Sequence, residues 1–287
     1  MAFQNIGIVG SGTMGHGIAH VCALAGQDVH LYDVDAGRVD AALAKVRGNL
    51  DKGVEKGKLS PLERDAALTH LHGATTLDAL AGSDLVIEAI PERLDLKRAL
   101  FQELEARVSS RAVLATNTSS LSIGSIAAEL SHPGRVLGTH FFNPVHIMTL
   151  LEIVVYDGTD TAVLDAVRAW GETIGKECIT VRDAPGFATS RLGVCLGMEA
   201  IRMVEQGVAS PEDIDKAMVL GYRHPVGPLR LTDMVGLDVR MNIGEHLATA
   251  LGNPAFQPPA LMRRMVADGK LGQKSGEGFY RWGTPQE

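Results

Sequence analysis

The chain has 287 residues; 45% of them are hydrophobic and 21% are charged, and the formal net charge is −7. These values are typical of a soluble globular protein and exclude a disordered chain or a coiled coil. The acidic balance argues against non-specific nucleic-acid binding, although it is compatible with a local basic patch for a phosphorylated small molecule. The length allows one large domain or two ordinary ones, each with a hydrophobic core.

The cysteine content and the N-terminal stretch indicate where the protein resides. Cys22, Cys178 and Cys195 include no C-x-x-C pair, which predicts no disulfide framework and indicates a reducing compartment, the cytoplasm. Residues 1–27 contain no Asp, Glu, Lys or Arg. Their glycines and polar side chains, and the lack of a basic N-terminal region, argue against a membrane helix or a signal peptide. We therefore expect a soluble protein with no membrane partner.

The first two thirds of the chain alternates between strand and helix patterns. This alternation predicts an α/β fold with a doubly wound, mostly parallel sheet covered by helices on both faces. Short apolar runs predict strands at 5–9, 28–32, 85–89, 112–116, 136–139, 150–155 and 178–181. Helical patterns predict helices from about 13 to 25, 36–56, after Ser60-Pro61, 94–108 and 161–174.

The pattern changes at the sequence Asp-Ala-Pro-Gly that spans 183–186. We predict a boundary near residue 184, with a Rossmann-type domain over 1–184 and an all-helical domain over 185–287. The helical periods predict one helix over 187–204, a second after Ser210-Pro211, and two more marked by Gly227-Pro228 and Pro258-Pro259. The first of these helices carries small residues at Ser190, Gly193, Gly197 and Ala200, a spacing that serves close packing or the approach of a ligand.

A dinucleotide-binding fingerprint lies between the first predicted strand and the first predicted helix. Its glycines permit a tight turn and a close approach of the backbone to a pyrophosphate, and the helix N-terminus attracts the phosphates. Asp33 ends the second predicted strand, where its carboxylate can accept hydrogen bonds from the adenosine ribose and repel a 2′-phosphate. The sequence therefore predicts NAD binding, against the alternative of a structural glycine-rich turn. The fingerprint consists of Gly10, Ser11, Gly12, Thr13, Met14 and Gly15.

Two histidines on the first predicted helix are candidates for a metal site. His16 and His20 are four residues apart, a spacing that can hold a metal ion. The helix carries no H-E-x-x-H glutamate, and no third ligand is evident in the sequence. We therefore predict no metal site.

Two polar clusters follow predicted strands, at the edge where open α/β sheets bind ligands. Asn117 to Ser120 follows the strand at 112–116, and His140 to Pro144 follows the strand at 136–139. Glu152 comes 12 residues after His140. A dehydrogenase needs a group that takes the proton of the alcohol, and a neutral imidazole oriented by a carboxylate does this near neutral pH. The alternative is a histidine that is merely packed in the core.

Six sequence blocks, taken together and in order, resemble the short-chain L-3-hydroxyacyl-CoA dehydrogenase family, in particular its bacterial 3-hydroxybutyryl-CoA dehydrogenases. The resemblance runs from Gly7 to Tyr280. It implies a Rossmann-type domain, a helical domain that forms a homodimer, NAD as cofactor and an acyl-CoA as substrate. The blocks are GSGTMG, EAIPERL, TNTSSLSI, HFFNPV, PGF…RL and KSGEGFY.

The resemblance also implies roles for individual residues. His140 matches the general base and Glu152 its carboxylate partner, and Ser119 matches the residue that hydrogen-bonds the substrate oxygen. Asp33 holds the adenine ribose. Lys56 and its neighbour Lys52 are candidates for a CoA phosphate, although a solvated helix face explains them equally well. The other matched residues contact the cofactor: Glu92, Lys97, Asn117, Ser119 and Asn143 at its nicotinamide end, and Lys274 from the C-terminal segment.

One position departs from the family pattern. The family usually carries Asn in Pro-Gly-Phe-x-x-Asn-Arg, where it is thought to contact the substrate, and this chain has Ser190. Serine keeps a hydroxyl but is shorter and lacks the paired donor and acceptor of the amide. The substrate contact of Ser190 and the acyl preference are therefore open.

The function expected from these observations is NAD-dependent oxidation of the 3-hydroxyl of an L-3-hydroxyacyl-CoA, or the reverse reaction. One alternative is a dehydrogenase of a free hydroxy acid or sugar acid on the same fold. Another is a catalytically idle dinucleotide-binding or structural protein, in which the His, Glu and Ser positions would be eroded. The sequence leaves the acyl-chain length, the pathway (fatty-acid, butanoate, polyester or aromatic-acid metabolism) and the physiological direction open.

Overall fold

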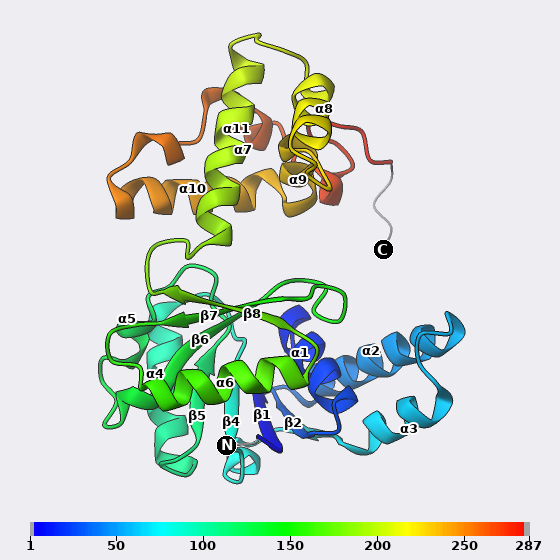
Figure 1. Ribbon diagram of the computed structural model, residues 1–287, viewed down its shortest axis with the longest axis vertical. Coiled ribbons are helices and arrows are strands. Elements are labelled where there is room, and N and C mark those ends of the chain that lie inside the picture. The colour runs from blue at the N-terminus through cyan, green and yellow to red at the C-terminus, as the bar shows by residue number, and fades with distance from the viewer. Residues whose placement is uncertain (1–2, 284–287) are drawn as a thin grey trace. The chain divides into compact units, whose positions relative to one another are not determined.

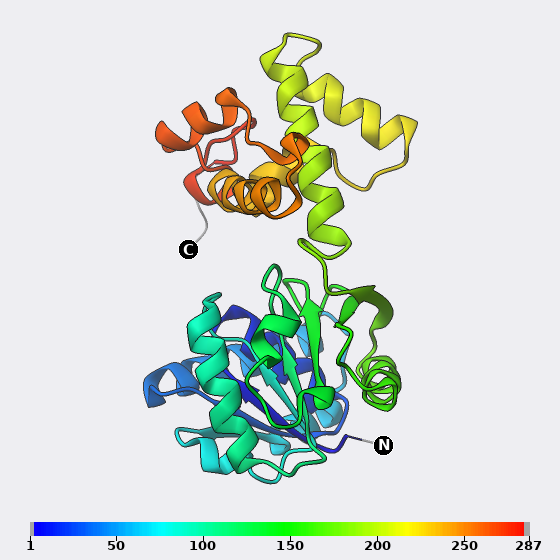
Figure 2. The ribbon, with the colours of Figure 1, turned by 90° about the vertical axis from the view of Figure 1, so that its left-hand side faces the viewer.

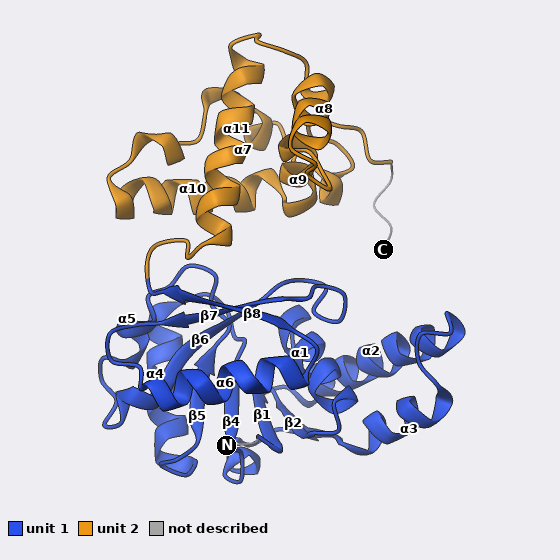
Figure 3. Ribbon diagram, viewed as in Figure 1, with its two compact units in different colours: residues 1–183 blue, residues 184–287 orange. Residues whose placement is uncertain are grey.

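The structure is a computed structural model that describes residues 3–283. The chain divides into two compact units, Met1–Asp183 and Ala184–Glu287 (Figure 3). The first is an α/β unit and the second is helical. This confirms the predicted fold class of a Rossmann-type domain followed by a helical domain.

The first unit is built on an eight-stranded sheet with the strand order β3-β2-β1-β4-β5-β6-β7-β8. Neighbouring strands are parallel except β6 and β7, which are antiparallel. Helices cover both faces (Figures 1 and 2), so the central strands are buried and apolar. The strands are β1 (Asn5–Val9), β2 (Asp28–Tyr32), β3 (Leu71–Ala74), β4 (Leu85–Glu88), β5 (Val113–Thr116), β6 (Val136–Phe141), β7 (Leu150–Val155) and β8 (Glu177–Arg182).

The helices of this unit begin where the sequence carries start signals. At α3, for example, Ser60 and Glu63 form a capping box in front of Pro61, which satisfies free N–H groups of the first turn. The helices are α1 (Thr13–Leu24), α2 (Ala36–Glu55), α3 (Pro61–Thr69), α4 (Leu94–Arg107), α5 (Ile123–Ala127) and α6 (Thr161–Thr173), with the short 3-10 helices η1 (Leu77–Leu80) and η2 (Pro133–Arg135).

Two sequence expectations for the sheet were wrong. Strand β3 was not predicted, because its sequence LHGA has few apolar residues; it is an edge strand that pairs only with β2, and an edge strand needs no continuous apolar run. Strand β6 was predicted to end at Thr139 but continues to Phe141. The antiparallel pairing with β7 extends it, so His140 lies in the strand and not after it.

The second unit contains five α-helices within the described residues. They are α7 (Thr189–Glu205), α8 (Pro211–Gly221), α9 (Pro228–Val235), α10 (Leu237–Leu251) and α11 (Ala260–Ala267), with the 3-10 helices η3 (Pro254–Phe256) and η4 (Gln273–Ser275). Their apolar faces meet in a core that includes Met198, Ile201, Leu229, Leu237 and Leu247. The core is separate from the one that holds α1 and α6 to the sheet.

The helix boundaries of the second unit correct two predictions. Helix α7 begins at Thr189 and not at Phe187, which has a φ of 49°. One helix was predicted to follow Gly227-Pro228, but the segment forms two helices, α9 and α10, separated by Gly236 at a φ of 101°. That conformation is open to glycine and ends a helix, yet a single glycine inside an apolar pattern gives no clear stop signal in the sequence.

Candidate active site

The glycine-rich turn after β1 is packed so closely that side chains are excluded at two positions. A Cβ atom on Gly10, which has a φ of 102°, would lie 2.6 Å from the carbonyl oxygen of Ala89. A Cβ atom on Gly15 would lie 1.7 Å from the carbonyl oxygen of Gly10. At Gly12, by contrast, a Cβ would meet no atom within 4 Å. The turn therefore leaves open space in front of the N-terminus of α1, which begins at Thr13, as a bound pyrophosphate requires.

A cavity of about 640 Å³ opens beside this turn, at the carboxyl ends of β1, β2 and β4. Asp33 lies on its wall and accepts hydrogen bonds from the backbone N–H and the hydroxyl of Ser11, at 3.0 and 2.8 Å. Partial burial raises the pKa of Asp33, but these hydrogen bonds, one from Asp35, and the charge of Arg38 outweigh it and hold the pKa below its usual value. The cavity thus carries a carboxylate on its wall, where the sequence predicts the contact with a dinucleotide ribose. Its lining also includes Thr13, Met14, Tyr32, Pro91 and Leu96.

Asparagine at position 33 is expected to weaken NAD binding and to relax the preference for NAD over NADP. Asp33→Asn removes a charged acceptor for the ribose hydroxyls, and such hydrogen bonds account for roughly a ten- to hundredfold change in KM. It also removes the charge that repels a 2′-phosphate, while Arg38 stays in the cavity. Steady-state KM values for NADH and NADPH test this. Asp35→Asn, at the N-cap of α2, is the matched control, and an equal effect there would contradict the role of Asp33.

The antiparallel pairing of β6 with β7 brings His140 and Glu152 together. The two residues are directly opposite each other in the register, and the ring nitrogen Nδ1 of His140 lies 2.6 Å from Oε2 of Glu152. Glu152 is fully buried and His140 is 7% exposed. Because the carboxylate is an acceptor only, Nδ1 donates the hydrogen, and Nε2 of a neutral ring is the nitrogen that can take up a proton. The predicted pair is therefore assembled in the structure.

The turn after β5 carries the hydroxyl-rich cluster. Asn117 at its start accepts the backbone N–H of Phe141 with its side-chain oxygen, at 2.9 Å, and this bond ties the turn to β6. Glu92 accepts hydrogen bonds from the Thr118 hydroxyl, the backbone N–H of Ser119 at 3.1 Å and the Ser120 hydroxyl at 3.2 Å. These hydrogen bonds to Glu92 fix the turn and with it the position of Ser119.

A buried ion pair supports Glu92 in turn. Lys97 on α4 and Glu88 at the end of β4 are both fully buried, with Nζ 2.6 and 2.8 Å from the two carboxylate oxygens. The ammonium also lies 3.2 Å from Glu92, and the Thr116 hydroxyl donates to Glu88 at 2.7 Å. Burial raises the pKa of Glu88 against the effect of Lys97. Burial also raises the pKa of Glu92, but Lys97 and the hydrogen bonds to the carboxylate outweigh it and lower that pKa. The sequence did not identify Glu88, which lies in an apolar strand.

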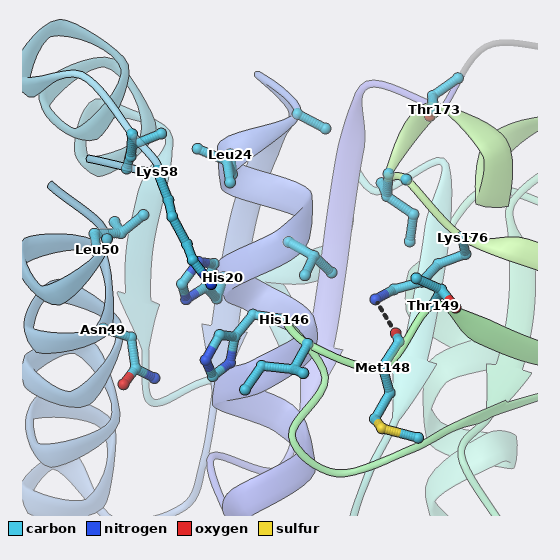
Figure 4. Close-up of a pocket in the computed structure, with 17 residues that line it drawn as sticks. His20, Leu24, Asn49, Leu50, Lys58, His146, Met148, Thr149, Thr173 and Lys176 are labelled. Atoms are coloured by element: carbon cyan, nitrogen blue, oxygen red, sulfur yellow. Dashed lines mark hydrogen bonds between the residues drawn. The ribbon is translucent and has the colours of Figure 1, made fainter. Parts of the chain in front are cut away.

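A second cavity of about 480 Å³ lies in the first unit, among α1, α2, the loop after β6 and the turn between α6 and β8 (Figure 4). Its walls are largely apolar, with Leu24, Leu50 and Met148 among them. Lys58 lines the cavity, whereas the predicted Lys56 and Lys52 are exposed near the same end of α2 and do not. The sequence missed Lys58 because it falls after the helix ends. Other polar lining residues are Asn49, His20, His146, Thr149 and Lys176.

Two histidines of this cavity stack on each other. The rings of His20 and His146 are 5.1 Å apart and inclined by 10°. Burial, followed by the nearby His146, His16 and Lys176, lowers the pKa of His20 to about 4. His16 hydrogen-bonds the backbone oxygen of Gly12 through Nδ1, at 2.8 Å. The two histidines of α1 are thus engaged separately, and among residues 3–283 no group of three or more metal-ligating side chains is assembled.

The low pKa of His20 predicts a loss of stability in mild acid. Between pH 6.5 and about 4 the unfolded chain binds a proton at His20 and the folded chain does not. The free energy of unfolding therefore falls as pH falls through this window, by up to about 3 kcal/mol for a fully buried group. Urea denaturation at pH 7.5 and 5.0 measures the change. His20→Gln should reduce this pH-dependent difference in the free energy of unfolding, and His246→Gln, at an exposed position, should not. An equal difference in the wild type and both variants would contradict the prediction.

The remaining predicted site residues lie in a loop of the first unit and in the second unit. Asn143 is exposed in the loop after β6 and is joined to Pro144 by a cis peptide bond. Ser190 is partly buried in the first turn of α7. Lys274 lies in η4, where its Nζ is 2.7 Å from the carboxylate of Asp238. The cofactor contacts of Asn143 and Lys274 and the substrate contact of Ser190 stay predictions.

The helices and the cysteines of residues 3–283 were considered for a membrane span and for reactive thiols. No helix among them combines the length and the apolar character that a membrane span requires. Cys22, Cys178 and Cys195 are free cysteines, and burial raises the pKa of the Cys22 thiol above its usual value, which makes it a poor nucleophile.

Comparison with known proteins identifies the family. The model of the 3-hydroxyacyl-CoA dehydrogenase NAD binding domain matches residues 5–184, and that of the 3-hydroxyacyl-CoA dehydrogenase C-terminal domain matches residues 186–282. A 3-hydroxybutyryl-CoA dehydrogenase of Mycobacterium tuberculosis is 43% identical over 283 residues, 98% of this chain and 99% of the relative.

Two further relatives extend this result. The crystal structure of (S)-3-hydroxybutyryl-CoA dehydrogenase from Ralstonia eutropha is 41% identical, with a TM-score of 0.95 over 99% of this chain and 100% of that one. The 3-hydroxyadipyl-CoA dehydrogenase of Escherichia coli K12 is 40% identical over 99% of this chain and 60% of the relative. The chain therefore belongs to the 3-hydroxyacyl-CoA dehydrogenase family of NAD-dependent oxidoreductases.

Proposed function

We propose that this enzyme oxidises the 3-hydroxyl of a short-chain L-3-hydroxyacyl-CoA, such as 3-hydroxybutyryl-CoA, to the 3-oxoacyl-CoA, and catalyses the reverse reaction. The buried contact of 2.6 Å between His140 and Glu152 is the observation that carries this proposal. This contact supports a base with a fixed tautomer, and His140 lies near the carboxyl end of β6, at the edge of the sheet where the dinucleotide turn also lies. The names of the full-length relatives support the 3-hydroxybutyryl group as substrate.

Each site residue then has a physical role. Nε2 of His140 accepts the proton of the 3-hydroxyl, and the negative charge of Glu152 stabilises the imidazolium that results. The hydroxyl of Ser119 donates a hydrogen bond to the substrate oxygen as it becomes a carbonyl. A bound NAD would supply the acceptor for the hydride that leaves C3 of the substrate. Residues 10–15 and Asp33 hold it through the pyrophosphate and the ribose, and Glu92, Lys97, Asn117, Asn143 and Lys274 are the proposed residues around its nicotinamide half.

The cavity between α1 and α2 is the proposed site of the CoA portion of the substrate. Its apolar walls suit the pantetheine arm, and its volume of about 480 Å³ is in the range of small-molecule sites. Lys58 on its wall, with the exposed Lys56 and Lys52 close by in the chain, supplies positive charge for the CoA phosphates. We include Ser190 of α7 in the acyl part of the site.

We also infer a homodimer that forms through the helical unit. The support is a set of large apolar side chains exposed on α7 to α10 and the loops between them, side chains of the kind that protein–protein interfaces bury. Sedimentation equilibrium should give twice the chain mass of 30.5 kDa, and a mass of one chain would contradict the inference. The exposed set includes Leu192 at 72%, Leu220 at 70%, Tyr222 at 76% and Met234 at 52%.

One assay distinguishes the proposed function from its alternatives. Consumption of NADH is followed by absorbance with acetoacetyl-CoA, with acetoacetate and with no substrate. The proposed function requires turnover of the thioester and a much slower reaction of the free acid. Equal rates with both would favour a free hydroxy-acid dehydrogenase, and no turnover with either would favour an idle dinucleotide-binding protein.

The three free cysteines support a reducing location such as the cytoplasm.

A further inference from the structure

The loop between β6 and β7 is held by the side chain of one buried lysine. Lys176 lies in the turn between α6 and β8 and is 7% exposed. Its ammonium group donates hydrogen bonds to the backbone oxygens of Val145 and Met148, the second at 2.7 Å (Figure 4). In the described part of the chain, these two are the hydrogen bonds that reach residues 143–148 from another element. The loop is therefore fastened to the turn before β8 through a single ammonium group.

The loop forms one helical turn that presents both of these oxygens to the lysine. The backbone N–H groups of Ile147 and Met148 donate to the backbone oxygen of Pro144, at 2.9 and 3.0 Å. A helical turn that is not continued leaves carbonyl groups without an N–H partner. An ammonium group has three donors and no acceptor, so it can satisfy two such carbonyl groups at once. Lys176 thus caps the turn.

Apolar packing holds the first half of this turn but not the second. Val145 is 1% exposed and lies against α1, where a Cβ atom on Gly17 would lie 2.8 Å from its Cγ2. Ile147 and Met148, in contrast, are 65% and 39% exposed, so burial of their side chains contributes less to fixing the chain there. The hydrogen bond from Lys176 to the backbone of Met148 therefore positions the second half of the turn.

The charge of Lys176 is desolvated without a counter-charge. No aspartate or glutamate among residues 3–283 forms an ion pair with it, and burial lowers the pKa of Lys176, an effect that only the Cys22 thiol opposes. Hydrogen bonds to two neutral carbonyl groups compensate a buried charge only in part. A methionine would fill similar space without this cost. The lysine is therefore explained by what its hydrogen bonds fix, and not by a gain in stability of the core.

The same loop forms one wall of the cavity between α1 and α2. Residues 146–149 line this cavity, and so does Lys176 itself. We propose that Lys176 is a positioning residue of the dehydrogenase reaction, which fixes this loop as the wall against which the CoA portion of the substrate binds. The assignment rests on the proposed function, which places the CoA portion in this cavity.

Kinetics with two thioesters test this role. Acetoacetyl-CoA is compared with acetoacetyl-N-acetylcysteamine, which lacks the nucleotide and most of the pantetheine arm. Lys176→Met should raise the KM for acetoacetyl-CoA by about tenfold and leave kcat within about threefold, because the loop contributes to binding while the strand register keeps His140 and Glu152 paired. With the truncated thioester, kcat/KM should change by less than about twofold. An equal loss of kcat/KM with both thioesters, or a loss expressed in kcat alone, would overturn the proposal.

Amide hydrogen exchange, followed by mass spectrometry, tests the positioning without turnover. In the Lys176→Met protein, the N–H groups of Ile147 and Met148 should exchange at least about tenfold faster than in the wild type, because the turn opens locally. Peptides from β6 and β7 should keep their protection. Unchanged exchange in the loop would show that Lys176 does not fix it, and faster exchange in both strands would show that Lys176 serves the fold as a whole. Either result would overturn the proposal.

Two further variants complete the design. Lys45→Met removes an exposed lysine of α2 and should leave the kinetic constants and the exchange rates within about twofold of the wild type. Lys176→Gln keeps N–H donors on a slightly shorter, uncharged side chain; it should give smaller changes in the same direction, and it carries the comparison if the methionine variant does not fold. If the wild type does not turn over acetoacetyl-CoA, the proposed function fails, whereas the exchange rates still decide whether Lys176 fixes the loop.

Discussion

Glutamine in place of His140 is expected to lower kcat with acetoacetyl-CoA by about 10²- to 10⁴-fold, the contribution typical of a general acid–base group. In the direction of reduction, the imidazolium delivers the proton that the substrate oxygen needs, and an amide cannot. Glutamine keeps a polar side chain next to Glu152, so the strand pairing that places it should survive. The NADH dissociation constant should change little, because the cofactor turn lies on other strands. Single-turnover absorbance measures the chemical step, and fluorescence titration measures the affinity for NADH.

The controls separate a chemical role from a structural one. His30→Gln replaces a partly buried histidine of β2 and should retain kcat within about twofold. Glu152→Gln should also lower kcat, because it removes the charge that stabilises the imidazolium, although the proton acceptor stays in place. If His140→Gln weakens NADH binding as much as it slows turnover, His140 is not the base.

Replacement of Lys97 by methionine is expected to reduce the free energy of unfolding by about 3–5 kcal/mol, the usual effect of removing one partner of a buried pair. The reason is the fully buried Glu88, which keeps the hydrogen bonds from Thr116 and from the backbone of Ile90 but loses the ammonium. Denaturant unfolding with wild type and variant measures the difference. Lys216→Met, at an exposed position of α8, should change the free energy by less than about 0.5 kcal/mol.

The effect of Lys97→Met on the free energy of unfolding should depend on pH in a defined direction. Without Lys97, burial acts on Glu88 unopposed by the ammonium and raises its pKa further above the value in the unfolded chain. The folded state then binds the proton more tightly than the unfolded state. The loss of unfolding free energy caused by Lys97→Met, compared with the wild type, should therefore be smaller at pH 5 than at pH 7. The double variant Glu88→Gln with Lys97→Met should lose this dependence. A destabilisation that is independent of pH would show that the ion pair is not its cause.

The parts of the site that depend on local pattern were accessible from the sequence. The glycine turn and Asp33 each belong to a short segment whose backbone follows from strand and helix periodicity, whereas the pairing of His140 with Glu152 was expected from the family resemblance, because their spacing alone gives only a weak signal. The change from alternating strands and helices to helices alone near residue 184 needed no tertiary information either. Topology then brings these segments to one edge of the sheet, because parallel strands end on the same side.

The parts that depend on tertiary packing were not accessible. Lys97 occupies a helix whose sequence reads as polar and exposed, and its complete burial arises from Glu88 on a different element. Lys58 was missed because the cavity it lines is made by α1, α2 and the loop after β6 together. Gly236 separates two helices through a φ of 101° that composition alone does not reveal. In each case, side chains far apart in sequence decide the local outcome.

The cross-strand register of His140 and Glu152 has a consequence for how this enzyme can vary. The two residues are paired across β6 and β7, and the loop between these strands is anchored along its length: Val145 is buried in the core, and Lys176 Nζ donates to the backbone oxygens of Val145 and Met148. Substitutions are therefore tolerated best at exposed positions of this loop such as Ile147, whereas one residue inserted inside either strand would turn a partner to the opposite face. Such substitutions should leave the contact between His140 and Glu152 intact, while an insertion in β6 or β7 should remove it.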